Sequence, residues 1–342
     1  MLFRRPALAF LLAAASAVPA AVAQNVPFVS GTVAMLSETN EGVNFFQPVF
    51  APVFAAPLGS HLLAEGRFNL DGFFIQKNRT GPYNGQLFKS TQIAQLDYIV
   101  NSRITVVAGQ SLVPFNTYNE RLSEIWQQNF QDAPMLAGVG TRDSGTSVGT
   151  QVRGNAYSNA HVHLNYVGWF STRINKYSLN GTRAVGDRVE VFFPNKRIEI
   201  GTSFTRRLQG TQYNSVGIHF FWLPYRSPLQ VRAEYAHNPH SQGYWIENSY
   251  RLSQWKGADS FVGRIEPLFR FQQSFRNSVG PGDGLPRVDT KIADFGLDYH
   301  LPHDVRFNAS YSRKFAQGAD GNIWGLSMSY RFLFPAWPGK KK

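Results

Sequence analysis

The chain has 342 residues with 34 Lys and Arg against 22 Asp and Glu, so its formal net charge is +12. It contains no cysteine, which excludes disulfides, thiolate metal sites and a lipid-bearing cysteine, and argues against a small disulfide-stapled scaffold. No stretch after the first 23 residues has about 18 consecutive apolar residues, so the sequence predicts no transmembrane helix.

The first 23 residues have the pattern of a cleaved signal peptide. Arg4 and Arg5 form a positive segment, residues 7–18 are apolar, and residues 21–23 read Ala-Val-Ala, an A-x-A cleavage pattern. An uncleaved membrane helix is disfavoured because the apolar run is short. The mature chain is therefore expected to start near Gln24, to be exported, and to carry a net charge of +10.

Residues 24–60 form an N-terminal segment with no regular pattern. Residues 30–38 can form a strand, and the following segment, Phe45–Leu58, is apolar but interrupted by three prolines that exclude a spanning helix. The sequence leaves open whether this segment supplies strands, a plug or a periplasmic arm.

From Leu62 onward, large apolar residues alternate with small or polar ones. In a β-strand, alternate side chains point to opposite faces, so each such run predicts a strand with one apolar and one polar face. The last run is the clearest, because every second residue from Trp324 to Phe334 is large and apolar. The predicted strands span residues 62–74, 87–100, 103–112, 146–156, 160–170, 187–193, 197–208, 213–223, 229–235, 243–254, 261–273, 288–300, 304–315 and 321–334. Pro267 predicts a bulge in its strand, because proline lacks the N–H of a ladder hydrogen bond.

A long interruption, residues 113–143, separates the third and fourth predicted strands. Within it, residues 118–130 predict a short amphipathic helix, because Leu122, Ile125 and Trp126 follow the i, i+3, i+4 spacing. This loop either folds into the interior as a constriction or packs on the rim as a lid. The sequence leaves both alternatives open.

The repeated alternation behind a signal peptide predicts an all-β fold, a transmembrane antiparallel β-barrel. Only helices and closed barrels satisfy backbone polar groups in hydrocarbon, and bacterial single-chain barrels have even strand numbers. We expect about 14 strands, or 16 if both parts of the N-terminal segment are strands. The predicted domains are residues 1–23 (signal peptide), 24–60 (N-terminal segment), 61–334 (β-barrel) and 335–342 (basic C-terminal tail).

The polar faces of the strands carry about as many arginines as acids. Such a wall predicts facing rows of opposite charge that orient polar solutes, and the alternative is that the pairs only hold the wall rigid. The predicted pore-lining residues are Arg67, Asp97, Arg153, Arg188, Glu190, Glu199, Arg207, Arg232, Glu234, Arg251, Arg264 and Arg306. The predicted constriction-loop residues are Asn119, Glu120, Arg121, Trp126 and Arg142.

Other chemistry has little support in the sequence. His161 and His163 share a strand face, but no carboxylate at ligand spacing completes a metal site, so no metal and no cofactor are expected. A hydrolase would need a serine nucleophile, and the one G-x-S-x-G match, at residues 145–149, runs into a predicted strand and not into the strand-to-helix turn that the nucleophile motif requires. We therefore predict no catalytic residues and no enzyme activity.

The stretch from Val106 to Leu122, VVAGQSLVPFNTYNERL, resembles bacterial outer-membrane porins, in particular the phosphate-selective group. The matching residues are Ala108, Gly109, Pro114, Phe115, Asn119, Glu120 and Arg121. The resemblance implies passive diffusion of small anions or other polar solutes. The phosphate preference is not carried over, because it depends on a lysine-rich constriction and the predicted wall has few lysines. The residues after Phe334 also depart from the usual aromatic C-terminus.

The sequence therefore predicts a porin-like diffusion channel in the outer membrane of a Gram-negative cell. The expected partners are outer-membrane lipid and lipopolysaccharide, the barrel assembly machinery and small polar solutes, with a homotrimer as the expected assembly and no nucleic acid. The first alternative is a non-conducting barrel that acts as a scaffold or sheath for a partner protein. The second alternative is an outer-membrane hydrolase.

Overall fold

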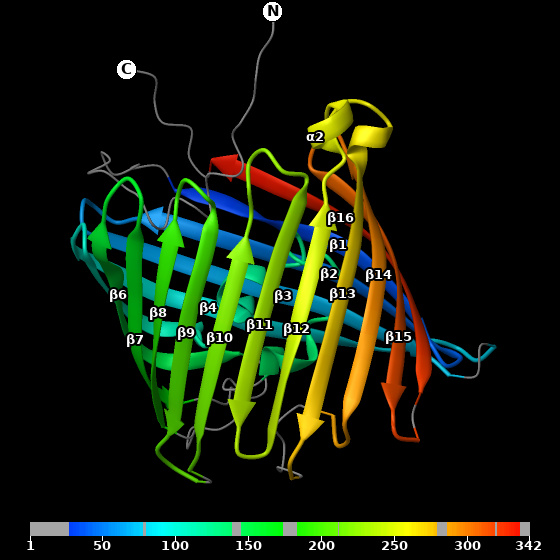
Figure 1. The fold of residues 1–342 in the computed structure, drawn as a ribbon, viewed down its shortest axis with the longest axis horizontal. Helices are drawn as coiled ribbons and strands as arrows, with labels where there is room; N and C mark the ends of the chain where they lie inside the picture. The colour runs from blue at the N-terminus through cyan, green and yellow to red at the C-terminus, as the bar shows by residue number, and fades with distance from the viewer. Residues whose placement is uncertain are drawn as a thin grey trace, which may run out of the picture.

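The computed structural model describes residues 27–77, 80–138, 145–173, 183–210, 212–278, 286–318 and 320–335. In these residues, sixteen strands form one closed antiparallel barrel in which each strand pairs with its sequence neighbours and β1 pairs with β16 (Figure 1). The strands are β1 (Phe28–Asn40), β2 (Val43–Pro57), β3 (Leu62–Gln76), β4 (Asn84–Asn101), β5 (Ile104–Leu112), β6 (Thr146–Ser158), β7 (His163–Arg173), β8 (Ala184–Phe193), β9 (Ile198–Arg207), β10 (Asn214–Trp222), β11 (Leu229–Asn238), β12 (Ser241–Tyr250), β13 (Ile265–Arg276), β14 (Thr290–Leu301), β15 (Val305–Ala316) and β16 (Gly321–Pro335). No helix in the described ranges is long and apolar enough to cross a membrane.

The N-terminal segment supplies the first two strands of the barrel. β1 pairs with β2 along its whole length, whereas the pairing of β2 with β3 skips the positions around Pro48 and Pro52. Proline has no N–H to donate to a ladder, which explains the gaps. The barrel therefore starts at Phe28, before the expected residue 61, and has sixteen strands, the larger of the two expected numbers. The predicted signal peptide and most of the basic tail lie outside the described residues.

The exposed and buried faces are inverted relative to a water-soluble sandwich. On β16, Leu326 is 65% exposed and the neighbouring inward-facing Ser329 is 2% exposed. Asp294 and Asp298 of β14 face the interior and are each 1% exposed, whereas Phe295 between them is 52% exposed. The apolar residues thus cover the outside and the charged residues lie inside, as expected of a barrel whose exterior faces hydrocarbon. The predicted all-β barrel is confirmed.

The connections differ between the two ends of the barrel. The end that holds the start of β1 and the end of β16, here called the terminal end, has turns of two to six residues with one exception. That exception is the β12–β13 connection, residues 251–264, which carries α2 (Ser253–Lys256) and η3 (Val262–Arg264). The opposite end, here called the far end, has the longest connection, between β5 and β6, and also the tight turn Glu41-Gly42, whose φ angles are +48° and +85°.

The predicted bulge at Pro267 is wrong. The register between β13 and β14 runs through Pro267 without a shift. On the other side, the pairing of β12 with β13 ends at Leu268, one residue before Pro267 is reached. Proline is accommodated there because it lies beyond the end of the β12–β13 ladder, where a missing N–H removes no bond to β12.

An arginine placed on the outward face should cost most near the middle of a strand. Phe295 lies in the middle of β14, and Val100, which is 44% exposed, lies near the end of β4. We expect Phe295→Arg to lower the free energy of unfolding by about 2–4 kcal/mol and Val100→Arg by about 0–1 kcal/mol, because the cost of a charge falls toward the interface. Urea unfolding of the protein in lipid vesicles measures both losses. Equal losses would contradict contact between the barrel exterior and hydrocarbon.

Candidate functional site: a loop across the barrel interior

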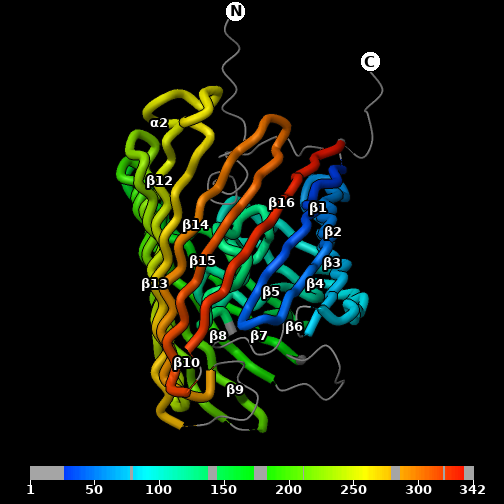
Figure 2. Tube along the Cα trace, turned by 90° about the vertical axis from the view of Figure 1, so that its right-hand side faces the viewer, coloured from blue at the N-terminus to red at the C-terminus, as the bar shows by residue number. Residues whose placement is uncertain are grey.

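The described part of the β5–β6 connection, residues 113–138, lies inside the barrel between its two walls (Figure 2). We call these residues the inner loop. The inner loop makes hydrogen bonds to β3, β8, β9, β11, β12, β13 and β15, which lie around most of the circumference. A lid on the rim would contact one end of the barrel only. The structure therefore favours the alternative in which this segment folds into the interior.

The helix expected over residues 118–130 is limited to a single turn, η1 (Tyr118–Leu122), and a second short turn follows at η2 (Met135–Gly138). The physical reason lies in the wall. The carbonyl oxygens of Ile125, Gln127 and Asn129 accept hydrogen bonds from Arg306, Arg232 and Asn308, at 2.8, 3.4 and 3.0 Å. In a helix over residues 118–130, the Ile125 carbonyl would accept from the N–H of residue 129, so Arg306 competes with the helix at this acceptor.

Apolar contacts hold the inner loop against one side of the barrel. Five of its side chains pack on wall residues of β7, β8, β10, β11 and β12. The loop side chains are Val113, Phe115, Tyr118, Leu122 and Leu136, and the wall side chains are Trp169, Ala184, Phe221, Ala236 and Trp245. The rings of Tyr118 and Trp245 meet edge to face with centroids 6.3 Å apart. Burying each large apolar side chain contributes about 1.5–3 kcal/mol, so this cluster is a strong attachment.

Glu234 of β11 fixes the start of the helical turn. One of its oxygens accepts hydrogen bonds from the backbone N–H groups of Thr117 and Tyr118, at 2.8 and 2.9 Å, and from the Thr117 hydroxyl at 2.5 Å. The indole N–H of Trp245 donates to its other oxygen at 3.3 Å. A carboxylate at this place satisfies N–H groups that have no partner within a helical turn. Glu234, predicted to line a pore, faces the interior and binds the inner loop.

Arg121 joins the same turn to β8 and β9. Its guanidinium donates to Glu190 at 2.6 Å and to Glu199 at 2.5 Å. Burial alone would lower the pKa of Arg121, but the carboxylates of Glu190, Glu199 and Glu120 outweigh burial and raise this pKa above its ordinary value. The guanidinium is therefore charged at any physiological pH.

A second arginine, which lies on the wall, donates to the inner loop. Arg188 of β8 donates to Glu120 of the turn at 2.7 Å and to the carbonyl of Asn116 at 2.6 Å. The amide of Asn119 donates to the carbonyls of Val113 and Gly145, at 3.0 and 2.7 Å, and so ties the start of the long connection to its end.

The opposite side of the inner loop meets arginines of β3, β15 and β16. Arg67 lies 3.6 Å from Glu124. The indole ring of Trp126 lies between Arg306 and Arg331, whose guanidinium carbons are 5.4 and 5.0 Å from the ring centroid. Cations over an aromatic face are attracted by its quadrupole, which holds Trp126 on this wall.

The end of the inner loop is held by β12 to β14. Arg270 donates to Asp294 at 2.7 Å and to the carbonyl of Asp132 at 2.9 Å, and its guanidinium lies 4.6 Å from the centroid of the Phe130 ring. Asn129 donates to Glu247 at 2.8 Å.

Most of the predicted wall residues face the interior and are paired with one another or with the inner loop. Asp97 of β4 forms an ion pair with Arg153 of β6, and Arg232 lies 3.5 Å from Glu247. Arg207 is the last residue of β9, at the far end, where its guanidinium lies 4.8 Å from the Tyr213 ring centroid.

Two predicted site residues lie outside the wall strands, and a third is not described. Arg251 and Arg264 are in the β12–β13 connection and not on wall strands, because β12 ends at Tyr250 and β13 begins at Ile265. Their strands were expected to extend to residue 254 and to begin at residue 261. Arg142 falls outside the described residues.

Two wall residues were not predicted as site residues: Trp245, which packs on Tyr118 of the loop, and His219, which lies beside the predicted residues Glu190 and Glu199. Trp245 shares its strand face with Glu247 and Ser249, so its alternation already placed it inside. Among the described residues, the potential metal ligands that converge are Glu190, Glu199 and His219, whereas the sequence predicted no metal site. The cluster joins three strands, and its formation depends on register across them.

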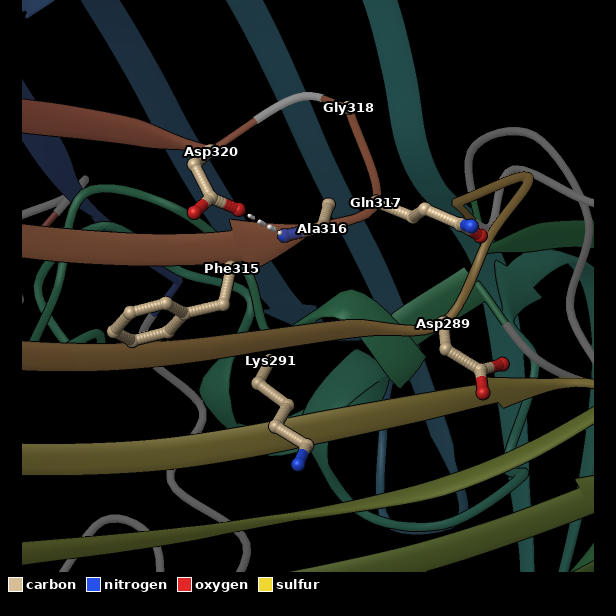
Figure 3. A pocket seen from close by; sticks show the side chains of 7 residues that line it. All are labelled: Asp289, Lys291, Phe315, Ala316, Gln317, Gly318 and Asp320. Carbon is tan, nitrogen blue, oxygen red and sulfur yellow. Dashed lines mark hydrogen bonds between the residues drawn. The ribbon is translucent and has the colours of Figure 1, made fainter.

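A separate recess of about 590 Å³ opens at the far end (Figure 3). Its lining residues are Asp289, Lys291, Phe315, Ala316, Gln317, Gly318 and Asp320. It shares no residue with the inner loop, and Asp320 is engaged with the backbone N–H of Ala316 at 2.9 Å. This recess belongs to the hairpin ends, so the inner loop is the better candidate for a functional site.

Comparisons with known proteins support the fold. No protein-family model matches the chain, and no curated protein matches it. Among solved structures, the OmpF of Salmonella typhi in complex with daunomycin matches with a TM-score of 0.63 and 10% identity over 90% of this chain and 97% of that one. The Pseudomonas putida OprB at high pH matches with a TM-score of 0.62 and 10% identity, over 90% of this chain and 94% of that one. The anion-selective porin of Comamonas acidovorans matches with a TM-score of 0.59 and 11% identity, over 90% of this chain and 99% of that one. The chain thus has the fold of bacterial outer-membrane porins, as its sequence resemblance implied.

Replacing Glu234 by Gln should loosen the helical turn without unfolding the barrel. The substitution keeps the shape but removes the charge, and hydrogen bonds to charged groups contribute about 1.5–3 kcal/mol. We therefore expect amide hydrogen exchange at Thr117 and Tyr118 to be at least about tenfold faster. Glu41→Gln, in an exposed turn, is the control and should leave these amides unchanged. Unchanged exchange in both variants would show that Glu234 does not anchor the loop.

Proposed function

We propose that the protein is an outer-membrane porin-like channel through which small polar or charged solutes diffuse passively, with the inner loop as its constriction. The observation that carries this proposal is a loop held across a closed barrel by side chains on opposite walls, with Arg121 on Glu190 and Glu199 on one side and Trp126 between Arg306 and Arg331 on the other. Such a loop narrows the barrel interior, and the wall of strands around it stays unbroken.

The size of the barrel supports a channel. Barrels of about eight strands are filled by their own side chains, whereas porins of about 16–18 strands leave an aqueous passage. The apolar exterior and charged interior support an outer-membrane location, with lipid and lipopolysaccharide around the barrel and a periplasmic terminal end. A homotrimer and use of the barrel assembly machinery are further parts of this proposal.

The pairing of arginines with carboxylates inside the barrel affects its expected ion selectivity. Arg121, Arg153 and Arg188 each lie against carboxylates, and so do Arg270 and Arg306. Paired charges produce a weaker net potential than a row of one sign. We therefore propose a general diffusion channel with weak ion preference and not a strongly anion-selective one.

A non-conducting scaffold is the second candidate function. The inner loop contacts most of the wall. These contacts support a scaffold if they leave no continuous passage beside the loop. A hydrolase gains no support from the described residues, because Ser147 of the G-x-S-x-G match lies within β6 and not on a strand-to-helix turn.

Single-channel recording in planar bilayers under a salt gradient separates the two candidates. We expect discrete, stable steps with a small reversal potential. Arg121→Gln should increase conductance or its fluctuations, because it frees the turn from β8 and β9. Arg207→Gln, which changes an arginine at the far end of β9, is the matched control and should retain the stable steps of the wild type. Folded, heat-modifiable protein without any conductance would contradict the channel and favour the scaffold.

A further inference from the structure

Three side chains of metal-ligating type meet on the wall beside Arg121. Glu190 of β8, Glu199 of β9 and His219 of β10 each offer one ligand atom, and these atoms lie within 4.8 Å of one another. Glu190 and His219 are only 5% and 1% exposed. Carboxylate oxygen and imidazole nitrogen are donors that Zn²⁺ and related divalent metals accept.

The strand register creates the space in which these groups meet. Gly201 of β9 pairs with Glu190 on one side and with His219 on the other. A Cβ at Gly201 would lie only 2.8 Å from His219 Nε2, so the glycine allows the imidazole to lie across β9 toward the carboxylates. His219 Nε2 is 3.3 Å from Glu199 Oε1. Two ligands of a tetrahedral zinc, with bonds of about 2.0–2.1 Å, are separated by about 3.4 Å.

The cluster contains buried polar atoms that are not fully hydrogen-bonded. Within the described residues, His219 Nδ1 has no hydrogen-bond partner, and His219 Nε2 approaches only Glu199 Oε1, at 3.3 Å, without hydrogen-bond geometry. Glu190 Oε2 lies 3.2 Å from Arg188 Nε, in an ion pair that also lacks hydrogen-bond geometry. The His219 side chain is 0% exposed. Buried polar groups nearly always have a partner, and exceptions call for an explanation such as a bound ion.

In this structure, the positive charge beside the two carboxylates of the cluster is the guanidinium of Arg121. It contacts Glu190 at 2.6 Å and Glu199 at 2.5 Å, and its side chain is 25% exposed toward the interior. We propose that Glu190, Glu199 and His219 form a site for a divalent metal such as Zn²⁺, and that Arg121 is its built-in competitor. The metal and the arginine both bind the carboxylates of Glu190 and Glu199, so metal binding in the wild type requires the Arg121 side chain to withdraw. This site goes beyond solute permeation and does not depend on it.

Isothermal titration calorimetry of the folded protein in detergent micelles with zinc chloride tests the proposal. Arg121→Gln removes the competitor while Glu234 and the apolar cluster still hold the loop, so this variant should bind Zn²⁺ at least about tenfold more tightly than the wild type. Adding His219→Gln to Arg121→Gln should abolish the gain. Adding His161→Gln, which changes a turn histidine outside the cluster, is the matched control and should preserve it.

Visible absorption spectroscopy with a substitute metal reports on the ligands around the metal directly. With Co²⁺ in place of Zn²⁺, the Arg121→Gln variant should show visible absorption that disappears with His219→Gln. Heat-modifiable migration of each variant checks that the barrel is folded. Zinc binding by Arg121→Gln that is no tighter than in the wild type, or that is insensitive to His219→Gln, would show an ion-pair network only. Conductance is measured separately, so failure of the metal site leaves the test of the channel unaffected.

Discussion

The pairing of β1 with β16 is the constraint on which the rest of the structure depends. A sheet that crosses hydrocarbon cannot leave an open edge, because no water is present to satisfy its N–H and C=O groups. The ladder between these two strands runs from Phe28↔Pro335 to Asn40↔Ile323 and closes the barrel. Once the barrel is closed, every strand has one face outward and one inward, so the alternation of the sequence becomes an apolar exterior and a charged interior.

The inner loop is positioned inside this wall by two kinds of interaction. An apolar cluster around Trp245 attaches it to β7 through β12, and ion pairs and hydrogen bonds attach it elsewhere. Buried ion pairs lose much of their Coulomb energy to desolvation, so they specify position more than they add stability. The apolar cluster supplies most of the energy of attachment, and residues such as Arg121 and Glu234 determine where the helical turn lies.

The parts of the fold that depend on local pattern could be predicted from the sequence, and those that depend on distant partners could not. Period-two alternation is visible within a single strand, which is why the strands from Leu62 onward were expected. β2 was left open because prolines interrupt its pattern. The helix in the inner loop was predicted too long because its local spacing does not reveal the distant wall side chains that bind this segment, such as Arg306 on the Ile125 carbonyl. The cluster of Glu190, Glu199 and His219 depends on the register of three strands, which no local pattern fixes.

The central claim is that the inner loop lines and narrows the passage, and chemical modification of one loop residue tests it most directly. The chain has no cysteine, so Glu124→Cys introduces a single thiol on the inner loop at a side chain that is 41% exposed. A bulky, membrane-impermeant thiol reagent should reduce the current of each open channel in a clear step, because it adds volume and charge at the constriction. Complete modification with unchanged single-channel current would show that solutes do not pass the inner loop and would contradict the account.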